Sequence, residues 1–142
     1  MKCRFGKIVN GEMILNEYGI IAYNEWVKLT DRFGNFELDV FQIMPNHMHG
    51  IIVLTAVGAG FTPVQTVWAG VNPAPTISDI VGAYKSLVAN ECLNIFKSNN
   101  EKMGKLWQRN YYEHIIRNER AYQNISNYII NNPAKWREDK FF

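Results

Sequence analysis

The sequence predicts an α+β fold, because segments with strand-like alternation form antiparallel pairs and segments with helical apolar spacing lie between them. The chain has 142 residues, a length that suits one domain with its own hydrophobic core, so we expect a single domain over residues 1–142. No apolar run approaches the roughly 20 residues of a membrane helix, and no signal peptide is recognisable. We therefore expect a cytoplasmic protein without a membrane partner.

The first half of the chain predicts a hairpin, a helix and a second hairpin. Asn10-Gly11 supplies the positive φ angles of a tight turn inside residues 4–16. Asn16 is a typical helix cap, and apolar residues at helical spacing follow it before a predicted loop at 30–35. The second hairpin has three parts: strand Phe36–Met44, turn Pro45-Asn46 and strand His47–Leu54.

The second half predicts a long loop, two helices and one strand. Residues 56–76 mix glycine, proline and small residues, so we expect a mobile loop that contacts a ligand, or disorder without function. Ser78 predicts the start of the next helix, and residues 111–116 predict a strand. Asn118 predicts the cap of the last helix, which Pro133 ends.

Two histidines head the strand of the second hairpin. His47 and His49 point to the same face, because side chains alternate across a strand. The apolar run that follows them predicts a central strand covered on both faces. Paired imidazoles are typical ligands of a divalent metal, although a pair is only half a metal site. A pair of partly exposed histidines at a strand end is an equally good interpretation of this motif alone.

Further candidates lie in the last third of the chain. Tyr128 and Asn132 are four residues apart on the predicted last helix, so a phenol and an amide share one face. Spacing alone makes this pair ordinary amphipathic surface. His114 is a possible ligand on the predicted strand, but a hydrogen-bonded structural histidine is the favoured interpretation.

Charge and cysteines add weaker indications. Residues 1–84 carry a net charge of −2 and residues 85–142 a net charge of +4, which is compatible with a phosphate-bearing partner or with ordinary solvated surface. Cys3 and Cys92 are too few and too far apart for a disulfide framework or a zinc site, so we expect free thiols.

Three blocks together are more specific than the histidine pair: Met-Pro-Asn-His-Met-His-Gly-Ile-Ile at 44–52, Trp-Gln-Arg-Asn-Tyr-Tyr-Glu-His-Ile-Ile-Arg-Asn at 107–118, and Asn-Tyr-Ile-Ile-Asn-Asn-Pro at 127–133. In this order they resemble the REP-associated tyrosine transposases, which belong to the HUH superfamily of single-strand DNA transposases. The resemblance implies a ferredoxin-like antiparallel sheet with helices on one face. It also implies that His47, His49 and Asn132 face a metal and that Tyr128 is the nucleophile.

The implied chemistry is DNA transposition by an endonuclease and strand transferase. One divalent metal, Mg²⁺ or Mn²⁺, would polarise the scissile phosphodiester, and the sequence does not choose between the two. Tyr128 would then form a 5′-phosphotyrosine and release a strand that ends in a 3′ hydroxyl. The 3′ hydroxyl of another strand could attack the phosphotyrosine and reverse the step. The implied partner is single-stranded or hairpin DNA from repeated palindromes, and the implied location is the bacterial nucleoid.

Basic and aromatic side chains are candidates for DNA binding in this interpretation. Phosphate contacts are predicted for Lys85, Arg109, Arg117, Lys135 and Arg137. Base stacking is predicted for Tyr111, Tyr112 or Trp136, whereas Trp107 is assigned to packing. Each of these residues also has an ordinary interpretation as core or surface.

One departure from the family pattern concerns the N-terminus. Family members carry an aromatic-rich first strand that this chain lacks, so we expect a sheet without that strand and either a monomer or a homodimer with exchanged strands. Two alternatives to the enzyme therefore stay open. One is a truncated, non-catalytic nucleic-acid-binding module, and the other is a metal hydrolase unrelated to DNA.

Overall fold

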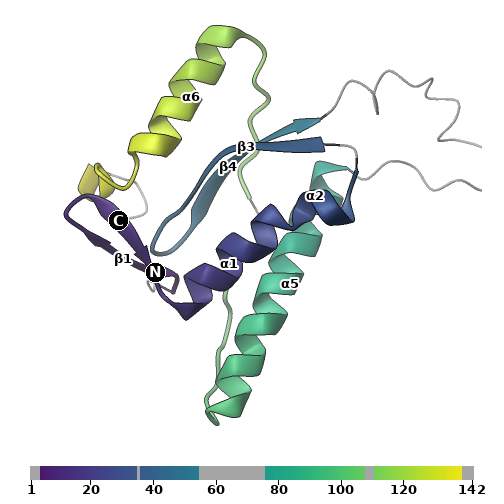
Figure 1. Cartoon of the computed structure of the whole chain (residues 1–142), viewed down its shortest axis with the longest axis vertical. Coiled ribbons are helices and arrows are strands. Elements are labelled where there is room, and N and C mark those ends of the chain that lie inside the picture. The colour runs from purple at the N-terminus through teal and green to yellow at the C-terminus, as the bar shows by residue number, and fades with distance from the viewer. Residues whose placement is uncertain (1–3, 35, 55–75, 108–110, 139–142) are drawn as a thin grey trace, which may run out of the picture.

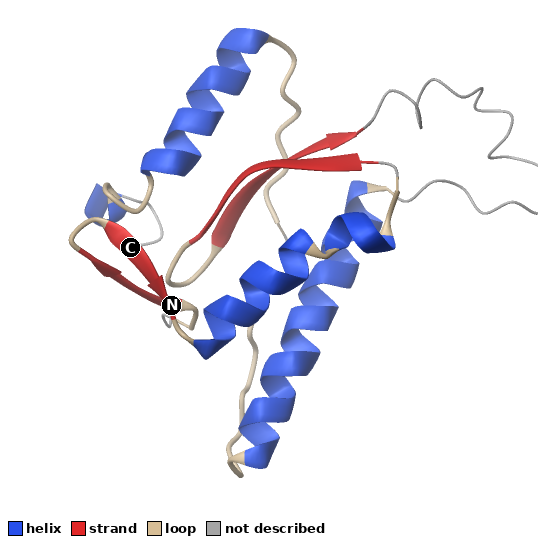
Figure 2. Cartoon of the chain, in the orientation of Figure 1, coloured by secondary structure: helices blue, strands red, loops and turns tan. Residues whose placement is uncertain are grey.

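The computed structural model describes residues 4–34, 36–54, 76–107 and 111–138. It confirms the α+β class, with antiparallel strand pairs and helices packed on them (Figure 2). The elements in chain order are β1 (Gly6–Val9), β2 (Glu12–Leu15), α1 (Glu17–Val27), α2 (Leu29–Arg32), β3 (Phe36–Ile43), β4 (Met48–Leu54), α5 (Ile77–Ser98), α6 (Glu119–Asn131) and the 3₁₀ helix η1 (Trp136–Glu138). The loop predicted at 56–76 lies outside the described residues, except for Thr76.

The first hairpin and its following helix form as predicted. Asn10 and Gly11 have φ angles of 52° and 77°, the positive values that a two-residue turn between β1 and β2 requires. The Asn16 side chain accepts hydrogen bonds from the backbone N–H groups of Tyr18 and Gly19, both at 2.9 Å. These bonds satisfy free donors in the first turn of α1 and fix where the helix begins.

The second hairpin carries the histidine motif. The backbone N–H of Met44 donates to the carbonyl of His47 at 2.8 Å and closes the Pro45-Asn46 turn. Phe41 then pairs with Gly50 and Gln42 with His49, after an irregularity between Leu38 and Phe41. The prediction of a central strand was wrong for the described part of the chain, where β4 pairs with β3 only.

The two faces of this hairpin have different neighbours. An added Cβ on Gly50 would lie 2.7 Å from the Trp26 ring, so the Gly50 face is pressed against α1. Helix α5 packs on α1 and completes a core on this side. His49 follows the opposite face, where α6 lies across the hairpin (Figure 1). The buried core consists of Phe5, Ala22, Trp26, Leu29, Phe36, Ile43, Ile80, Tyr84, Val88 and Cys92.

Three local predictions were wrong. Residues 111–116 are not a strand, because no described strand lies beside them to accept a ladder of hydrogen bonds. Thr76, and not Ser78, caps α5, since its hydroxyl accepts from the Asp79 N–H while the Asp79 carboxylate accepts from the Thr76 N–H. The short helix α2 occupies part of the loop predicted at 30–35, and its first residue, Leu29, is buried.

Helix α6 has the bounds that the sequence predicts. Asn118 caps it by accepting from the N–H of Ala121 at 2.8 Å, and the helix ends at Asn131, before Pro133. None of the helices in the described ranges is both long and apolar enough to span a membrane.

Candidate functional site

The histidine pair lies at the start of β4, beside the Pro45-Asn46 turn. Both rings are half-buried, and their Nε2 atoms are 3.0 Å apart. The Nδ1 atom of His47 lies 2.7 Å from the side-chain oxygen of Asn46. The strand alternation therefore places the imidazoles on one face, as predicted, and the structure adds that their Nε2 atoms converge.

The separation of the two Nε2 atoms suits a shared metal ion. Nitrogen ligands lie roughly 2.1 Å from a first-row divalent metal, so two ligands at a right angle are roughly 3 Å apart. Within the described ranges no three His, Cys, Asp or Glu side chains gather as a metal-binding group. A divalent ion at this position therefore needs a further donor of another kind, such as an amide oxygen or a phosphate oxygen of a substrate.

Asn132 offers such an amide. It follows the last turn of α6, is only 3% exposed, and its Nδ2 atom has no hydrogen-bond partner among the described residues. Buried amides normally have partners, because an unpaired one keeps its full desolvation penalty. Rotation of the amide by half a turn exchanges its nitrogen and oxygen, so the same position can present a ligand oxygen. Two imidazole nitrogens and an amide oxygen are donor types that divalent metals accept.

Tyr128 lies directly beside the histidine pair. Its ring is in edge contact with the His49 ring, with centroids 5.3 Å apart and planes at 69°. Half of the Tyr128 side chain is exposed, so a solvent-borne group can reach its hydroxyl. The structure therefore brings together His47, His49 and Tyr128, with Asn132 one helical turn beyond the tyrosine.

A hydrogen bond fixes α6 against the sheet. The Tyr122 hydroxyl donates to the Asp39 carboxylate on β3 at 2.5 Å. This bond raises the pKa of the Tyr122 phenol, with a smaller contribution from burial, because ionisation would bring two anions together. On the buried side of the same helix lie Ser126 and Ile129, and Tyr128 lies at the edge of this side, half exposed and in contact with His49.

The predicted DNA-binding residues are not all near this site. Lys135 and Arg137 are exposed on the segment that follows α6 and flank Trp136, which stacks on His47. Arg117 precedes α6 and lies about 16 Å along the helix axis from Tyr128, at 1.5 Å per residue. Lys85 is on α5, which packs on α1 (Figure 1). Arg109 lies outside the described residues.

The other aromatic and histidine candidates divide between core and surface. Trp107 packs as predicted, with its ring against Phe5 and its indole N–H donating to the Lys85 carbonyl at 3.0 Å. Tyr112 and His114 are exposed, and the Tyr111 hydroxyl lies 3.1 Å from that of Ser78. The prediction of a hydrogen-bonded, structural His114 has no support in this exposed position.

Two residues in the site were not predicted for the roles they have here. Asn46 was interpreted only as a turn residue, and Trp136 only as a base-stacking residue. Ligand histidines usually donate a hydrogen bond from the ring nitrogen that does not bind the metal. A side chain with an acceptor oxygen next to a candidate ligand, such as Asn46 next to His47, is therefore a signal that the sequence does contain. The contact of Trp136 with His47 spans 89 positions of chain, and no local pattern predicts it.

The fold and the site define an α+β protein in which a histidine pair on a hairpin faces a tyrosine on a helix. The chain is 37% identical, over 146 residues, to an uncharacterized protein of Haemophilus influenzae, and the match covers 99% of this chain and 78% of that protein. The chain therefore belongs to the same family as that Haemophilus influenzae protein. No family model matches the chain, and no solved structure matches it.

Proposed function

We propose that the protein nicks single-stranded DNA and transfers the cut strand through a 5′-phosphotyrosine at Tyr128, with one divalent metal, Mg²⁺ or Mn²⁺, at the histidine pair. The single observation that carries this proposal is the contact between the Tyr128 and His49 rings, at 5.3 Å between centroids. A nucleophile and a pair of metal ligands supplied by elements far apart in the chain have little structural reason to meet. Joint binding of one phosphodiester would explain why the nucleophile and the metal ligands lie together.

The residues of the site would divide the work as follows. His47 and His49 would hold the metal through Nε2, and the Asn132 amide would complete the protein's donor set. The bound metal would neutralise charge on the non-bridging oxygens of the scissile phosphate. Lys135 and Arg137, both exposed beyond α6, would hold neighbouring phosphates of the strand.

Tyr128 would carry the covalent step. Its hydroxyl oxygen forms a bond to phosphorus while the bond from phosphorus to the 3′ oxygen breaks. The phenol proton is lost and the 3′ oxygen gains one, so the step is balanced. The phosphotyrosine conserves the energy of the phosphodiester, and a 3′ hydroxyl from another strand can reverse the step and complete the transfer.

The test is adduct formation on hairpin-bearing single-stranded DNA with Mg²⁺ or Mn²⁺, read on a denaturing gel. A 5′-phosphotyrosine links the protein to the fragment downstream of the cut, so we expect a 3′-labelled strand to migrate with the protein and a 5′-labelled strand to be released free. Tyr128→Phe should abolish the adduct. Tyr23→Phe is the matched control, because Tyr23 is a similarly exposed tyrosine on α1 that contacts Phe41.

Each other outcome identifies a different function. DNA retained in a native gel without any adduct, by wild type and Tyr128→Phe alike, would indicate a non-catalytic nucleic-acid-binding module. Absence of both binding and adduct would leave the histidine pair to a metal hydrolase unrelated to DNA. An adduct that persists in Tyr128→Phe would contradict the assignment of the nucleophile.

A further inference from the structure

The Asn46 side chain is in hydrogen-bond contact with the His47 ring. Its oxygen lies 2.7 Å from His47 Nδ1, and a carbonyl oxygen can only accept a hydrogen bond. With the Asn46 amide in this orientation, Nδ1 is the donor. In a neutral imidazole the other nitrogen then carries the lone pair, and in His47 this is Nε2, the atom that lies 3.0 Å from His49.

The same contact assigns the His49 ring. Two Nε2 atoms at 3.0 Å form a hydrogen bond only if one of them bears a proton, and His47 Nε2 does not. His49 Nε2 is then the donor in the metal-free protein. The two histidines are therefore in opposite tautomers, and only His47 is already in the form that binds a cation through Nε2.

A second contact fixes the plane of the His47 ring. The Trp136 ring stacks on it, with centroids 6.0 Å apart and planes at 27°. Trp136 is half-buried in η1, directly after the helix that carries Tyr128. The imidazole is thus oriented from its own turn by Asn46 and from the C-terminal part of the chain by Trp136.

We propose that Asn46 is a positioning residue that fixes His47 in its Nδ1–H tautomer, so that Nε2 carries the lone pair with which it would bind a divalent cation, while Trp136 holds the plane of the ring. Asn46 acts through His47. Outer partners of this kind orient ligand histidines at metal sites, and removing one typically weakens metal affinity by about 10–100-fold. The inference rests on the proposed function only in treating the histidine pair as a cation site.

The first measurement is the tautomeric state of His47 in the metal-free protein, from long-range ¹H–¹⁵N correlation spectra recorded where the rings are neutral. The chain has three histidines, so single His→Gln variants assign the signals. We expect Nδ1–H at His47 and Nε2–H at His49 in wild type. Asn46→Asp keeps an acceptor oxygen and should keep the His47 signal, whereas Asn46→Ala should give a mixture of tautomers.

The second measurement is Mn²⁺ affinity without DNA, by titration calorimetry. Asn46→Ala should bind Mn²⁺ about 10–100-fold more weakly than wild type, and Asn46→Asp should bind at least as well. Asn94→Ala is the matched control, an exposed asparagine on α5, and should equal wild type.

The proposal is overturned if wild-type His47 is in the Nε2–H form, or if Asn46→Ala changes neither the tautomer nor Mn²⁺ affinity. The wild-type spectrum decides this even if Asn46→Ala fails to fold. Failure of the proposed function is separate. A protein that never forms a DNA adduct but loses Mn²⁺ affinity on Asn46→Ala refutes the nicking reaction and leaves the role of Asn46 in place.

Discussion

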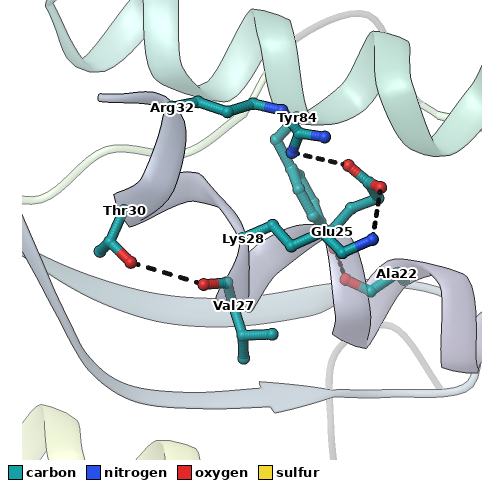
Figure 3. A network of polar contacts seen from close by, with 7 residues as sticks. All are labelled: Ala22, Glu25, Val27, Lys28, Thr30, Arg32 and Tyr84. Carbon is teal, nitrogen blue, oxygen red and sulfur yellow. Dashed lines mark hydrogen bonds and ion pairs between the residues drawn. The ribbon is translucent and has the colours of Figure 1, made fainter. Parts of the chain in front are cut away.

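Two buried polar groups in this protein have opposite surroundings. Glu25, on α1, is 3% exposed, and its carboxylate is bound by the Arg32 guanidinium at 2.9 Å and approached by the Lys28 ammonium at 3.9 Å (Figure 3). Asn132 is equally buried, yet its amide nitrogen has no hydrogen-bond partner among the described residues. Glu25, Arg32 and Lys28, here called the Glu25 cluster, pair a buried carboxylate with two cations of the same chain. The Asn132 amide, by contrast, still has a hydrogen-bond donor that no described residue uses.

The two groups also differ in how many elements of the fold their surroundings need. Arg32 and Lys28 come from the helical turns next to Glu25, so the cluster forms whenever α1 and α2 form. The histidine site needs β4, α6 and η1 together, and it keeps an exposed phenol and an amide nitrogen that has no partner within the described part of the chain. Trp26 Nε1, in the core, is also buried without a partner among the described residues, so the proximity of Tyr128 to His49, and not the amide alone, marks this site.

The largest effect is expected from His49→Ala. Removing one of the two imidazoles should weaken Mn²⁺ binding by more than about 100-fold, since even outer partners of a ligand contribute 10–100-fold. The melting temperature should change little, because the ring is only half-buried. Calorimetric titration with Mn²⁺ and thermal melting by circular dichroism check the two parts. His114→Ala is the control, and an equal loss there would contradict the site.

The Glu25 cluster should respond in the opposite way. Arg32→Ala leaves the Glu25 carboxylate buried without its 2.9 Å partner, so we expect about 2 kcal/mol of destabilisation in urea unfolding, with Mn²⁺ binding unchanged. Lys28→Ala should cost about 0.5 kcal/mol or less, because Lys28 is 54% exposed and lies 3.9 Å away. Equal effects from both variants would show that the carboxylate is solvated.

Much of the fold was predictable because its signals are local. Asn10-Gly11 produced the first turn, Asn16 and Asn118 produced caps, and Pro45-Asn46 produced the second turn. The strand predicted at 111–116 failed for a non-local reason. An apolar, aromatic segment becomes a strand only if a neighbouring strand satisfies its backbone, and none of the described strands does.

The site was predictable to a lesser degree. Alternation along β4 brought His47 and His49 to one face, and the resemblance to tyrosine transposases singled out Tyr128 and Asn132. Neither argument predicted that α6 packs against the hairpin. This packing involves the hydrogen bond from Tyr122 to Asp39, which are 83 positions apart in the chain. The stack of Trp136 on His47 was missed because local periodicity says nothing about contacts at that separation.

A third prediction concerns Asn132, where one substitution should preserve or raise stability and lower Mn²⁺ affinity. Asn132→Leu replaces a buried amide, whose nitrogen has no partner in the described ranges, with an apolar side chain of similar shape, so we expect no loss of stability and a gain of up to about 1 kcal/mol. Mn²⁺ affinity should fall by about tenfold or more if the amide completes the donor set. Asn131→Leu, the same change at the exposed neighbour, is the control for both measurements. A clear loss of stability specific to Asn132→Leu would mean that the amide already has a partner.

The smallest effect concerns the attachment of α6 and its dependence on pH. The raised pKa of Tyr122 means that the neutral phenol, bonded to Asp39, is favoured in the folded state. Its stabilisation is therefore fully present below pH about 10, the value of an unperturbed phenol, and is lost as the pH rises through the folded-state pKa. Tyr122→Phe should accordingly lower the melting temperature at pH 7–9, and the difference from wild type should narrow above pH about 10.

Asp39→Asn separates the hydrogen bond from the charge. An amide oxygen still accepts from Tyr122, but ionisation of the phenol no longer faces a carboxylate, so the pH dependence should weaken while part of the stabilisation remains. Melting curves of the two variants and wild type between pH 7 and 11 test this. A Tyr122→Phe difference that stays constant over the whole range would show that the hydroxyl does not hold α6 through its proton. The position of Tyr128 beside His49 would then depend on apolar packing around Ile129 alone.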